Sequence, residues 1–315
     1  MIKVLVTGAA GFIGSNLVDK LLEHEHEVVG IDNFNDYYDP NIKEKNLSDS
    51  TKNKGYKLYR LDILSFEKLK AVFSKEKPHK VIHLAARAGV RPSRENPELY
   101  TQVNVLGTVN LLKLSADFKI KQFIFGSSSS VYGNSSSLPF SEDDPCEMII
   151  SPYGASKRAA EFWVESFYRT YGLKSVILRF FTVYGPRGRV DMAPSLFTKA
   201  VVERRPIEQF GDGSSSRDYT YIDDVVDGIL KVVKGNLDFE IINLGNNHPV
   251  KLYELIKIIE DITGEKAKIR HIPKQVGDVE KTWANIENAK NLLEWQPKIF
   301  LPEGLAKYIR WLREN

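Results

Sequence analysis

The N-terminal segment, residues 1–32, contains a strand, a glycine-rich turn and a helix in an order that few folds accommodate. Residues 1–7 are apolar and end at Gly8, and residues 12–23 repeat their apolar side chains with helical spacing. Between them, Gly8, Gly11 and Gly14 stand in the pattern GAAGFIG. Glycine permits a tight turn and a close approach of the backbone to a pyrophosphate, which the following helix N-terminus attracts. The segment therefore predicts a dinucleotide-binding βαβ unit.

The next strand, residues 27–32, ends in an acidic residue, Asp32. A carboxylate at this position accepts hydrogen bonds from ribose hydroxyls and repels a 2′-phosphate, which predicts NAD, not NADP, as the cofactor. The following strand, residues 56–63, carries Asp62 near its end. This second carboxylate either meets the adenine or is simply a polar strand end.

Strands and helices alternate through the first half of the chain, which is typical of a parallel sheet covered on both faces. Further strands are predicted at 80–85, 122–126 and 174–180, and helices at 65–75, 98–118 and 151–171. Beyond Phe180, glycine and proline interrupt the pattern, and helices are predicted near 223–234, 251–263, 286–293 and 302–313. We predict a doubly wound α/β fold of the Rossmann type. Its NAD-binding domain is predicted to comprise 1–180 and about 222–247, and a smaller nucleotide-sugar lobe about 181–221 and 248–315.

The composition excludes several classes of protein. The 315 residues include 44 basic and 41 acidic side chains, and a net charge of +3 is too balanced to indicate a nucleic-acid partner. The one cysteine, Cys146, fits a reducing compartment. No apolar run approaches the roughly 18 residues of a membrane span, so we expect a cytoplasmic protein without a membrane partner. The six histidines are scattered, so no metal is expected, and the lysine-rich stretch 43–57 is interpreted as a solvated surface.

The strongest chemical signal is the segment SPYGASKRAAEFW, in which Tyr153 and Lys157 share one face at the start of a helix. Ser151 and Pro152 are typical of a helix cap and first position. An ammonium about 4 Å from a phenol stabilises its phenolate by ~4 kcal/mol at an effective dielectric constant of ~20. This would lower the phenol pKa from about 10 to about 7. We therefore predict that Tyr153 is a general base and that Ser128 binds both the phenol and a substrate hydroxyl.

Seven stretches of the chain together resemble the extended short-chain dehydrogenase/reductase family: GAAGFIG, HLAA, SSSSVYG, YGASK, LRFFTVYGP, RDYTYIDD and GDV. The resemblance implies NAD as the cofactor, Ser128, Tyr153 and Lys157 as catalytic residues, and a homodimer formed through the helices 98–118 and 151–171. The cofactor-binding residues that it implies are Gly8, Gly11, Phe12, Ile13, Gly14, Asp32, Asn33, Asp62, Ile63, Leu84, Ala85, Ala86, Asn104, Tyr153, Lys157 and Phe180.

Within this family, three stretches resemble nucleotide-sugar 4-epimerases, most closely those that act on UDP-glucuronate: DNFNDYYDP, AARAGVRPS and RFFTVYGPRGRVDMA. The resemblance implies that Thr182 and Arg189 contact the sugar carboxylate, onto which arginine forks with paired hydrogen bonds. The alternative is that Arg189 only decorates a solvated loop. The implied substrate-binding residues are Arg91, Ser128, Ser129, Ser130, Tyr153, Thr182, Arg189, Arg217 on the diphosphate and Asp278 on the uridine ribose.

Three positions leave the sugar open. Gln275 stands where many relatives carry an arginine, and Val190 stands where proline is usual in the glucuronate type. Thr282 leaves space for a bulky sugar substituent. Epimerisation of UDP-N-acetylglucosamine or UDP-glucose therefore stays an alternative.

The residues after Ser128 help to distinguish an epimerase from other enzymes of the same fold. A 4,6-dehydratase typically carries an Asp–Glu pair there, whereas this chain has Ser129 and Ser130. The acid of a UDP-glucuronate decarboxylase is likewise not evident, although that enzyme shares the oxidation step. A catalytically silent NAD-sensing protein is the alternative from a different class, and the intact set of Ser128, Tyr153 and Lys157 argues against it.

Overall fold

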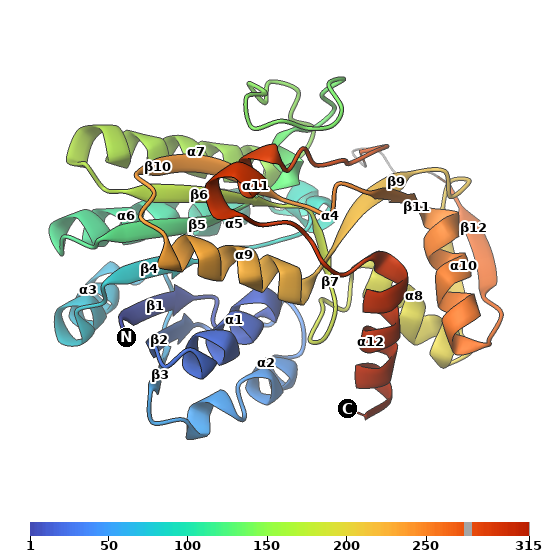
Figure 1. The fold of residues 1–315 in the computed structure, drawn as a ribbon, viewed down its shortest axis with the longest axis horizontal. Coiled ribbons are helices and arrows are strands. Elements are labelled where there is room, and N and C mark those ends of the chain that lie inside the picture. Colours follow the sequence, from blue (N-terminus) through green and yellow to red (C-terminus); the bar gives the residue numbers. More distant parts are fainter. Residues whose placement is uncertain (274–278, 315) are drawn as a thin grey trace.

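A central sheet of seven parallel strands organises the computed structural model, which describes residues 1–273 and 279–314 (Figure 1). The strand order is β10-β6-β5-β4-β1-β2-β3. The strands are β1 (Lys3–Thr7), β2 (Glu27–Asp32), β3 (Tyr56–Arg60), β4 (Lys80–His83), β5 (Gln122–Ser128), β6 (Ser175–Phe180) and β10 (Phe239–Leu244). The order reverses direction between β1 and β4, and a crevice at the carboxyl ends of such strands is where ligands bind in this kind of sheet.

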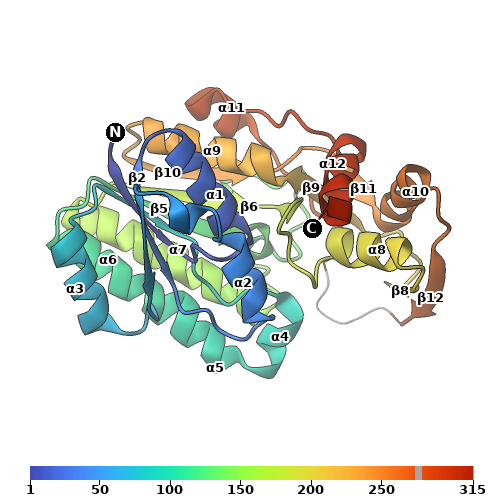
Figure 2. The same ribbon diagram turned by 90° about the horizontal axis from the view of Figure 1, so that it is seen from below.

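Helices cover both faces of the sheet (Figures 1 and 2). The buried strands explain this, because a parallel sheet with apolar side chains on both faces needs cover on both. Two hydrophobic clusters, one on each face, form the core. One face carries α1 (Phe12–Glu23), α9 (Ile222–Lys234) and α11 (Glu287–Leu293), and the other carries α3 (Phe66–Glu76), α6 (Gly107–Asp117) and α7 (Pro152–Tyr171).

Short helical elements occupy the connections at the carboxyl edge of the sheet. They are α2 (Pro40–Asn46), α4 (Val90–Glu95), α5 (Pro97–Tyr100), the π-helical segment Thr101–Leu106 that runs into α6, and the 3₁₀ turn Ser129–Val131. A further 3₁₀ turn, Ser50–Lys52, precedes β3.

A second, smaller group of elements lies at the end of the molecule away from the sheet's helical layers (Figure 1). It contains the three-stranded sheet β11-β9-β7 and the pair β12-β8. Its elements are β7 (Thr182–Tyr184), α8 (Ala193–Val202), β8 (Pro206–Phe210), β9 (Ser216–Tyr221), β11 (Pro249–Lys251), α10 (Leu252–Thr263), β12 (Lys268–Ile272) and α12 (Leu301–Glu314). The chain passes through this group between β6 and α9, returns to the large sheet at β10, and then enters the group again.

The predicted doubly wound α/β fold is confirmed, while several predicted elements differ in detail. The predicted helix 98–118 consists of α5, the π-helical segment and α6. Three α-helices were not predicted, α2, α4 and α8. Of these, α2 and α8 carry a proline at the start of their first turn, Pro40 and Pro194, and proline is well tolerated there although it breaks a helix interior. For α8, the omission came from interpreting Pro194 as an interruption of the pattern.

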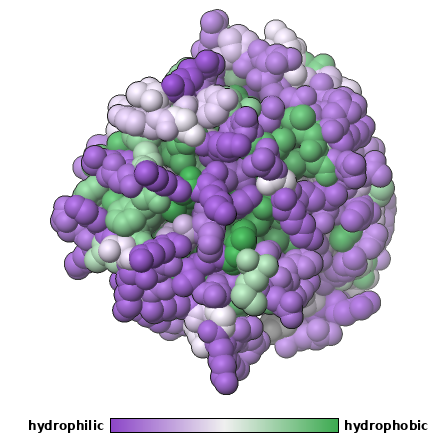
Figure 3. All heavy atoms as spheres, turned by 60° about the vertical axis from the view of Figure 1, so that its left-hand side comes forward, coloured by the Kyte–Doolittle hydropathy of each residue, from purple (hydrophilic) through white to green (hydrophobic). Residues whose placement is uncertain are grey.

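The face of the molecule that lies at the left of Figure 1 is mainly hydrophilic, and hydrophobic residues form separate patches between hydrophilic ones (Figure 3). Among the described residues, none of the helices combines the length and the apolar character that crossing a membrane requires.

A buried histidine, His83, ends β4 beneath the carboxyl edge of the sheet and is 1% exposed. Its Nδ1 lies 2.7 Å from the Thr7 hydroxyl, and its Nε2 lies 3.0 Å from the Thr108 hydroxyl. The Thr108 hydroxyl donates to the Asn104 carbonyl, so it accepts from Nε2–H and the ring is neutral. Burial lowers the pKa of His83 to about 3.

This low pKa predicts an acid-sensitive fold. The unfolded chain takes up a proton on His83 near pH 6.5, whereas the folded protein resists it. The stabilisation present above that pH is therefore lost as the pH falls towards 3, by about 1.4 kcal/mol per pH unit. We expect His83→Gln to flatten the pH dependence of the unfolding free energy by about this slope in urea titrations between about pH 4 and 6. An unchanged slope would show that His83 does not contribute.

Candidate active site

The glycine turn between β1 and α1 forms the floor of a large cavity at the carboxyl edge of the sheet. Gly8 has a φ of +69°, and a Cβ there would lie 2.7 Å from the Ala85 backbone nitrogen. A Cβ on Gly14 would lie 2.0 Å from the Gly8 carbonyl oxygen. Only glycine fits these two positions, because the turn and the loop after β4 approach so closely. No side chain caps α1 at Gly11, so the first turn of the helix presents backbone N–H groups at the cavity.

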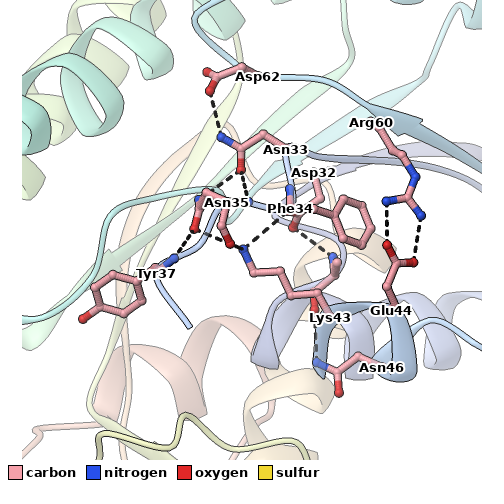
Figure 4. Close-up of polar contacts among 11 residues, drawn as sticks. Asp32, Asn33, Phe34, Asn35, Tyr37, Lys43, Glu44, Asn46, Arg60 and Asp62 are labelled. Atoms are coloured by element: carbon pink, nitrogen blue, oxygen red, sulfur yellow. Dashed lines mark hydrogen bonds and ion pairs between the residues drawn. The ribbon is translucent and has the colours of Figure 1, made fainter. Parts of the chain in front are cut away.

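The acidic end of β2 is joined to the glycine turn. The Asp32 carboxylate accepts hydrogen bonds from the backbone N–H groups of Ala10 and Phe34 at 3.1 and 2.8 Å. At the next strand end, Asp62 accepts a hydrogen bond of 2.7 Å from the Asn33 side-chain amide (Figure 4). The two predicted carboxylates therefore both line the cavity, and hydrogen bonds between the loops hold them in place.

The three predicted catalytic residues lie at another side of the cavity, at and beside the carboxyl end of β5. Ser128 ends β5, and Tyr153 and Lys157 lie on the first two turns of α7, which the Ser151 hydroxyl caps by accepting a 3.0 Å bond from the Gly154 N–H. Ser128 forms a side-chain hydrogen bond with Tyr153. All three catalytic candidates line the cavity.

The electrostatics of this group differ from the prediction. Burial raises the pKa of the Tyr153 phenol above its ordinary value, and the hydrogen bond from Ser128 and the charge of Arg189 oppose that rise. Lys157 does not lower it, because its ammonium donates a 2.7 Å hydrogen bond to the Gly126 carbonyl instead. Burial also lowers the pKa of Lys157 to about 8. The predicted activation of Tyr153 by Lys157 is therefore wrong for the protein alone.

Behind these residues lies a buried ion pair between α7 and β6. Glu161, one helical turn beyond Lys157, accepts bonds of 3.0 and 2.8 Å from the Arg179 guanidinium. The side chains of Glu161 and Arg179 are 1% and 0% exposed. Glu161 also accepts a hydrogen bond from Ser127, the residue before Ser128. The pair thus connects the strand end, the helix and the neighbouring strand that together position the catalytic candidates.

The third wall of the cavity comes from the loop after β7. Arg189 lines the cavity with Thr182 and Met192, and its guanidinium makes paired bonds of 3.0 and 2.6 Å with Asp191. It also donates a 3.3 Å bond to the Tyr37 hydroxyl of the loop after β2. A neighbour in the same stretch, Arg187, instead forms an ion pair of 2.7 Å with Asp19 on α1. Of the two loop arginines, Arg189 is the one that lines the cavity.

Nearly all predicted site residues come together in this cavity of about 350 Å³. Three described residues do not line it. Arg91 stacks its guanidinium 4.0 Å from the centroid of the Phe210 ring, and Arg217 donates to the backbone carbonyls of Ser216 and Glu280. The third is Asn104. Asp278 and Gln275 lie outside the described residues.

Asn104 binds the backbone of the loop after β4 on the side away from the cavity. It is 1% exposed on the π-helical segment. Its side-chain oxygen accepts from the Arg87 N–H at 2.8 Å, and its amide nitrogen donates to the Arg87 carbonyl and the Ser156 hydroxyl, each at 2.9 Å. Because residues 84–90 line the cavity, Asn104 positions a cavity wall without itself reaching the cavity.

Sequence reasoning missed several cavity residues, among them Tyr37, Tyr38, Lys43 and Arg87. The two tyrosines were visible in the stretch DNFNDYYDP, where aromatic side chains in a polar loop were a usable signal. Lys43 had no such signal, because it opens a lysine-rich stretch. The interpretation of that stretch as solvated is wrong for Lys43, whose exposed fraction is 4%.

The residues present fit a bound NAD. The cramped glycines leave the turn open to a pyrophosphate, Asp32 and Asp62 stand where the adenosine would lie, and Lys157 and Tyr153 stand at the far end of the same cavity. In such a complex, the turn and Asp32 would face the adenosine half of the cofactor and Lys157 the nicotinamide half.

Comparisons with known proteins agree with this geometry. Residues 4–245 match the model of the NAD dependent epimerase/dehydratase family. The UDP-glucuronate 4-epimerase of Thermodesulfobacterium geofontis is 44% identical over 312 residues, covering 99% of this chain and 96% of its own. The structure of UDP-glucuronic acid 4-epimerase from Bacillus cereus, in complex with UDP-glucuronic acid and NAD, superposes with a TM-score of 0.94 at 36% identity and 99% coverage of both chains.

A second solved structure is also similar to nearly the whole chain. The UDP-glucose 4-epimerase of Thermotoga maritima with UDP-glucose has a TM-score of 0.93 at 34% identity, again with 99% coverage of both chains. The family match confirms the predicted use of NAD and the resemblance inferred from the motifs. The chain belongs to the NAD-dependent epimerase/dehydratase family.

Proposed function

We propose that the protein is an NAD-dependent UDP-sugar 4-epimerase that interconverts UDP-glucuronate and UDP-galacturonate through a 4-keto sugar. The observation that carries the proposal is that one cavity joins the glycine turn and Asp32, the group of Ser128, Tyr153 and Lys157, and the arginine Arg189. The activities named for the Thermodesulfobacterium and Bacillus relatives support it.

In this mechanism the chain's own residues handle the proton and the orientation of the sugar. Tyr153, as phenolate, takes the proton of the sugar 4-hydroxyl with Ser128 as hydrogen-bond partner, and returns it after the 4-keto sugar has presented its other face. Lys157, held by the Gly126 carbonyl, orients the nicotinamide ribose. Bound NAD supplies a reversible acceptor for the C4 hydride and a positive charge that favours the phenolate.

Arg189 gives the site its preference for a carboxylated sugar. Its guanidinium already binds a carboxylate in the protein, that of Asp191, with the paired geometry that a sugar carboxylate would receive. Thr182 lines the cavity beside it. Holding the carboxylate away from alignment with the 4-ketone π system protects this β-keto acid from losing carbon dioxide. The absence of an acidic pair at Ser129 and Ser130 also disfavours elimination.

We expect Arg189→Ala to lower kcat/KM for UDP-glucuronate about 100-fold, which corresponds to ~2.7 kcal/mol, because a charge-assisted pair is lost. Turnover of UDP-glucose should change little. The matched control is Arg187→Ala, whose guanidinium pairs with Asp19 at 2.7 Å outside the cavity lining. Product formation is measured by chromatography with purified protein and no added NAD. Equal effects of Arg189→Ala on both sugars would contradict the assignment.

Incubating the purified protein with UDP-glucuronate, UDP-N-acetylglucosamine and UDP-glucose separates the remaining activities. The expected product is UDP-galacturonate. Release of carbon dioxide would instead identify a decarboxylase, and no 4-epimer from any of the three sugars would overturn the proposal.

We also propose the division of labour between the two parts of the chain. Residues 1–180 and about 222–247 hold NAD, and residues about 181–221 and 248–315 hold the nucleotide sugar. Arg217 lies on β9 of the second part, and Arg91 of the first part stacks on Phe210 of β8 in the second. The cytoplasm remains the proposed location, because a single cysteine fits a reducing compartment.

A homodimer through α6 and α7 completes the proposal. These helices pack against each other. Leu106, directly before α6, is 51% exposed, and Phe162 and Trp163 on α7 are 55% and 44% exposed. Large apolar side chains that are exposed on a pair of packed helices favour an interface there. We expect the protein to sediment as a dimer and Trp163→Glu to shift it towards monomer. Tyr253→Glu, at an equally exposed residue of α10, should leave the dimer intact, and a monomeric wild-type protein would refute the proposal.

A further inference from the structure

Asp191 is a carboxylate to which the mechanism above gives no task. It follows Arg189 by two residues in the loop after β7, and the Met192 N–H, which donates to the Arg189 carbonyl at 3.3 Å, closes the turn that contains it. Arg189 lines the cavity, whereas Asp191 does not, and the Asp191 side chain is 44% exposed. Asp191 therefore binds the guanidinium from the side that faces away from the cavity.

The hydrogen bonds of the Arg189 guanidinium leave one of its nitrogen atoms for a ligand. Nε and Nη2 donate to the two Asp191 oxygens at 3.0 and 2.6 Å, and Nη2 also donates to the Tyr37 hydroxyl at 3.3 Å. Within residues 1–273 and 279–314, no acceptor forms a hydrogen bond with Nη1. In a planar guanidinium, Nη1 lies opposite the edge that Nε and Nη2 form. Because Asp191 binds that edge from outside, the Nη1 donors are directed towards the cavity.

Tyr37 restrains the same guanidinium from the loop after β2. Its ring centroid lies 5.7 Å from the Arg189 guanidinium carbon, and its hydroxyl donates to Asp191 at 3.3 Å. Its backbone N–H donates to the Asn35 side-chain oxygen at 3.1 Å (Figure 4). A Cβ on Gly89, in the loop after β4, would lie 2.6 Å from the Tyr37 hydroxyl. Three loops therefore meet at Arg189 and limit its movement.

We propose that Asp191 is a specificity-determining residue of the sugar site. It fixes the direction of the Arg189 guanidinium, so that Nη1 stays available for a carboxylate on the sugar. Asp191 is thus a positioning residue that acts through Arg189 and does not touch the substrate. The inference rests on the proposed function, in which Arg189 binds the carboxylate of UDP-glucuronate.

The charge of Asp191 acts in the opposite direction. A carboxylate beside Arg189 cancels part of the attraction for the sugar carboxylate, so its removal by itself would strengthen the binding of UDP-glucuronate. The Asp191 side chain is exposed, however, and water and salt screen a charge in such a position. Screening does not replace geometry, because a rotated guanidinium no longer meets a carboxylate with aligned hydrogen bonds. We therefore expect the loss of positioning to outweigh the loss of repulsion.

The test compares wild type with Asp191→Asn and with Asp191→Glu, which keeps the carboxylate. The matched control is Asp19→Asn, because Asp19 pairs at 2.7 Å with Arg187 of the same loop and neither residue lines the cavity. Each protein is saturated with NAD, and kcat and KM are measured for UDP-glucuronate and UDP-glucose. Calorimetry gives the Kd of both nucleotide sugars. The Asn change is also made in the Arg189→Ala background, where there is no guanidinium to position.

We expect Asp191→Asn to raise KM and Kd for UDP-glucuronate about 10-fold, because the charge-assisted pair is misdirected. Both values for UDP-glucose should stay close to those of wild type. Asp191→Glu should recover most of the loss, Asp19→Asn should match wild type, and Asp191→Asn should cause no further loss in the Arg189→Ala background. Unchanged or tighter binding of UDP-glucuronate by Asp191→Asn would overturn the inference. So would an equal loss in Asp191→Glu, or a loss that persists without Arg189.

The two measurements separate this inference from the epimerase proposal. If wild type binds UDP-glucuronate but forms no UDP-galacturonate, the epimerase proposal fails, and the ratio of the two Kd values still decides the role of Asp191. If wild type epimerises UDP-glucuronate and Asp191→Asn does so with the same KM and Kd, only the role of Asp191 is refuted.

Discussion

Replacing Tyr153 with phenylalanine is expected to lower the rate of epimerisation about 10²- to 10⁴-fold while the fold and the affinity for the nucleotide sugar are retained. The change removes one oxygen atom, the one that would exchange a proton with the sugar 4-hydroxyl. Ser128, whose hydrogen bond lowers the pKa of the phenol, loses this partner at the same time.

The measurement is single-turnover kinetics combined with calorimetric binding of UDP-glucuronate. Tyr171→Phe is the control, because this tyrosine lies at the end of the same helix and is 64% exposed. An affinity loss as large as the rate loss would mean that the phenol binds the sugar without performing chemistry. A rate within a few-fold of wild type would remove Tyr153 from the mechanism.

The second large effect concerns stability. Glu161→Ala should cost about 3–5 kcal/mol of unfolding free energy, because it leaves the fully buried Arg179 guanidinium without its carboxylate. The matched control lies one turn further along α7, where Glu165 pairs with Arg169 at the surface, with side chains 31% and 69% exposed. Glu165→Ala should cost less than about 1 kcal/mol.

Urea unfolding of both variants measures the difference directly. Similar losses in the two proteins would show that burial does not distinguish these two pairs. Because Glu161 also accepts a hydrogen bond from Ser127, the variant should lower the rate of catalysis in the folded protein as well. That second effect separates a purely structural pair from one that positions the end of β5.

The sequence predicted the fold and the catalytic cluster because both depend on local patterns. The glycines of the first turn, the acid at the end of β2, and the spacing of Tyr153 and Lys157 are readable one segment at a time. The direction of the Tyr153 pKa shift could not be predicted in this way. Four residues of helix put the two side chains on one face, but the direction of Lys157 is decided by the Gly126 carbonyl of a distant strand.

The burial of Lys43 could not be predicted from local patterns either. Its neighbours in sequence are exposed lysines, and only the return of the loop after β2 buries its ammonium between Asn35 and Asp32. The positions of Asn104 and Arg91 also depended on tertiary contacts. Asn104 binds the backbone of Arg87, and Arg91 stacks on Phe210 across the two parts of the molecule. Motif matching predicted both residues for the site but could not predict their contacts.

The position of β10 has a consequence for the synthesis of the chain. This strand pairs with β6, all six residues of which are buried in the finished protein. As the polypeptide leaves the ribosome, β6 has one unpaired edge until residues up to Leu244 have emerged, and an unpaired apolar edge is a template for pairing with other chains. A fragment that stops at Phe180 therefore ends with that edge uncovered. It should aggregate when expressed, even though it contains every residue of the nucleotide turn.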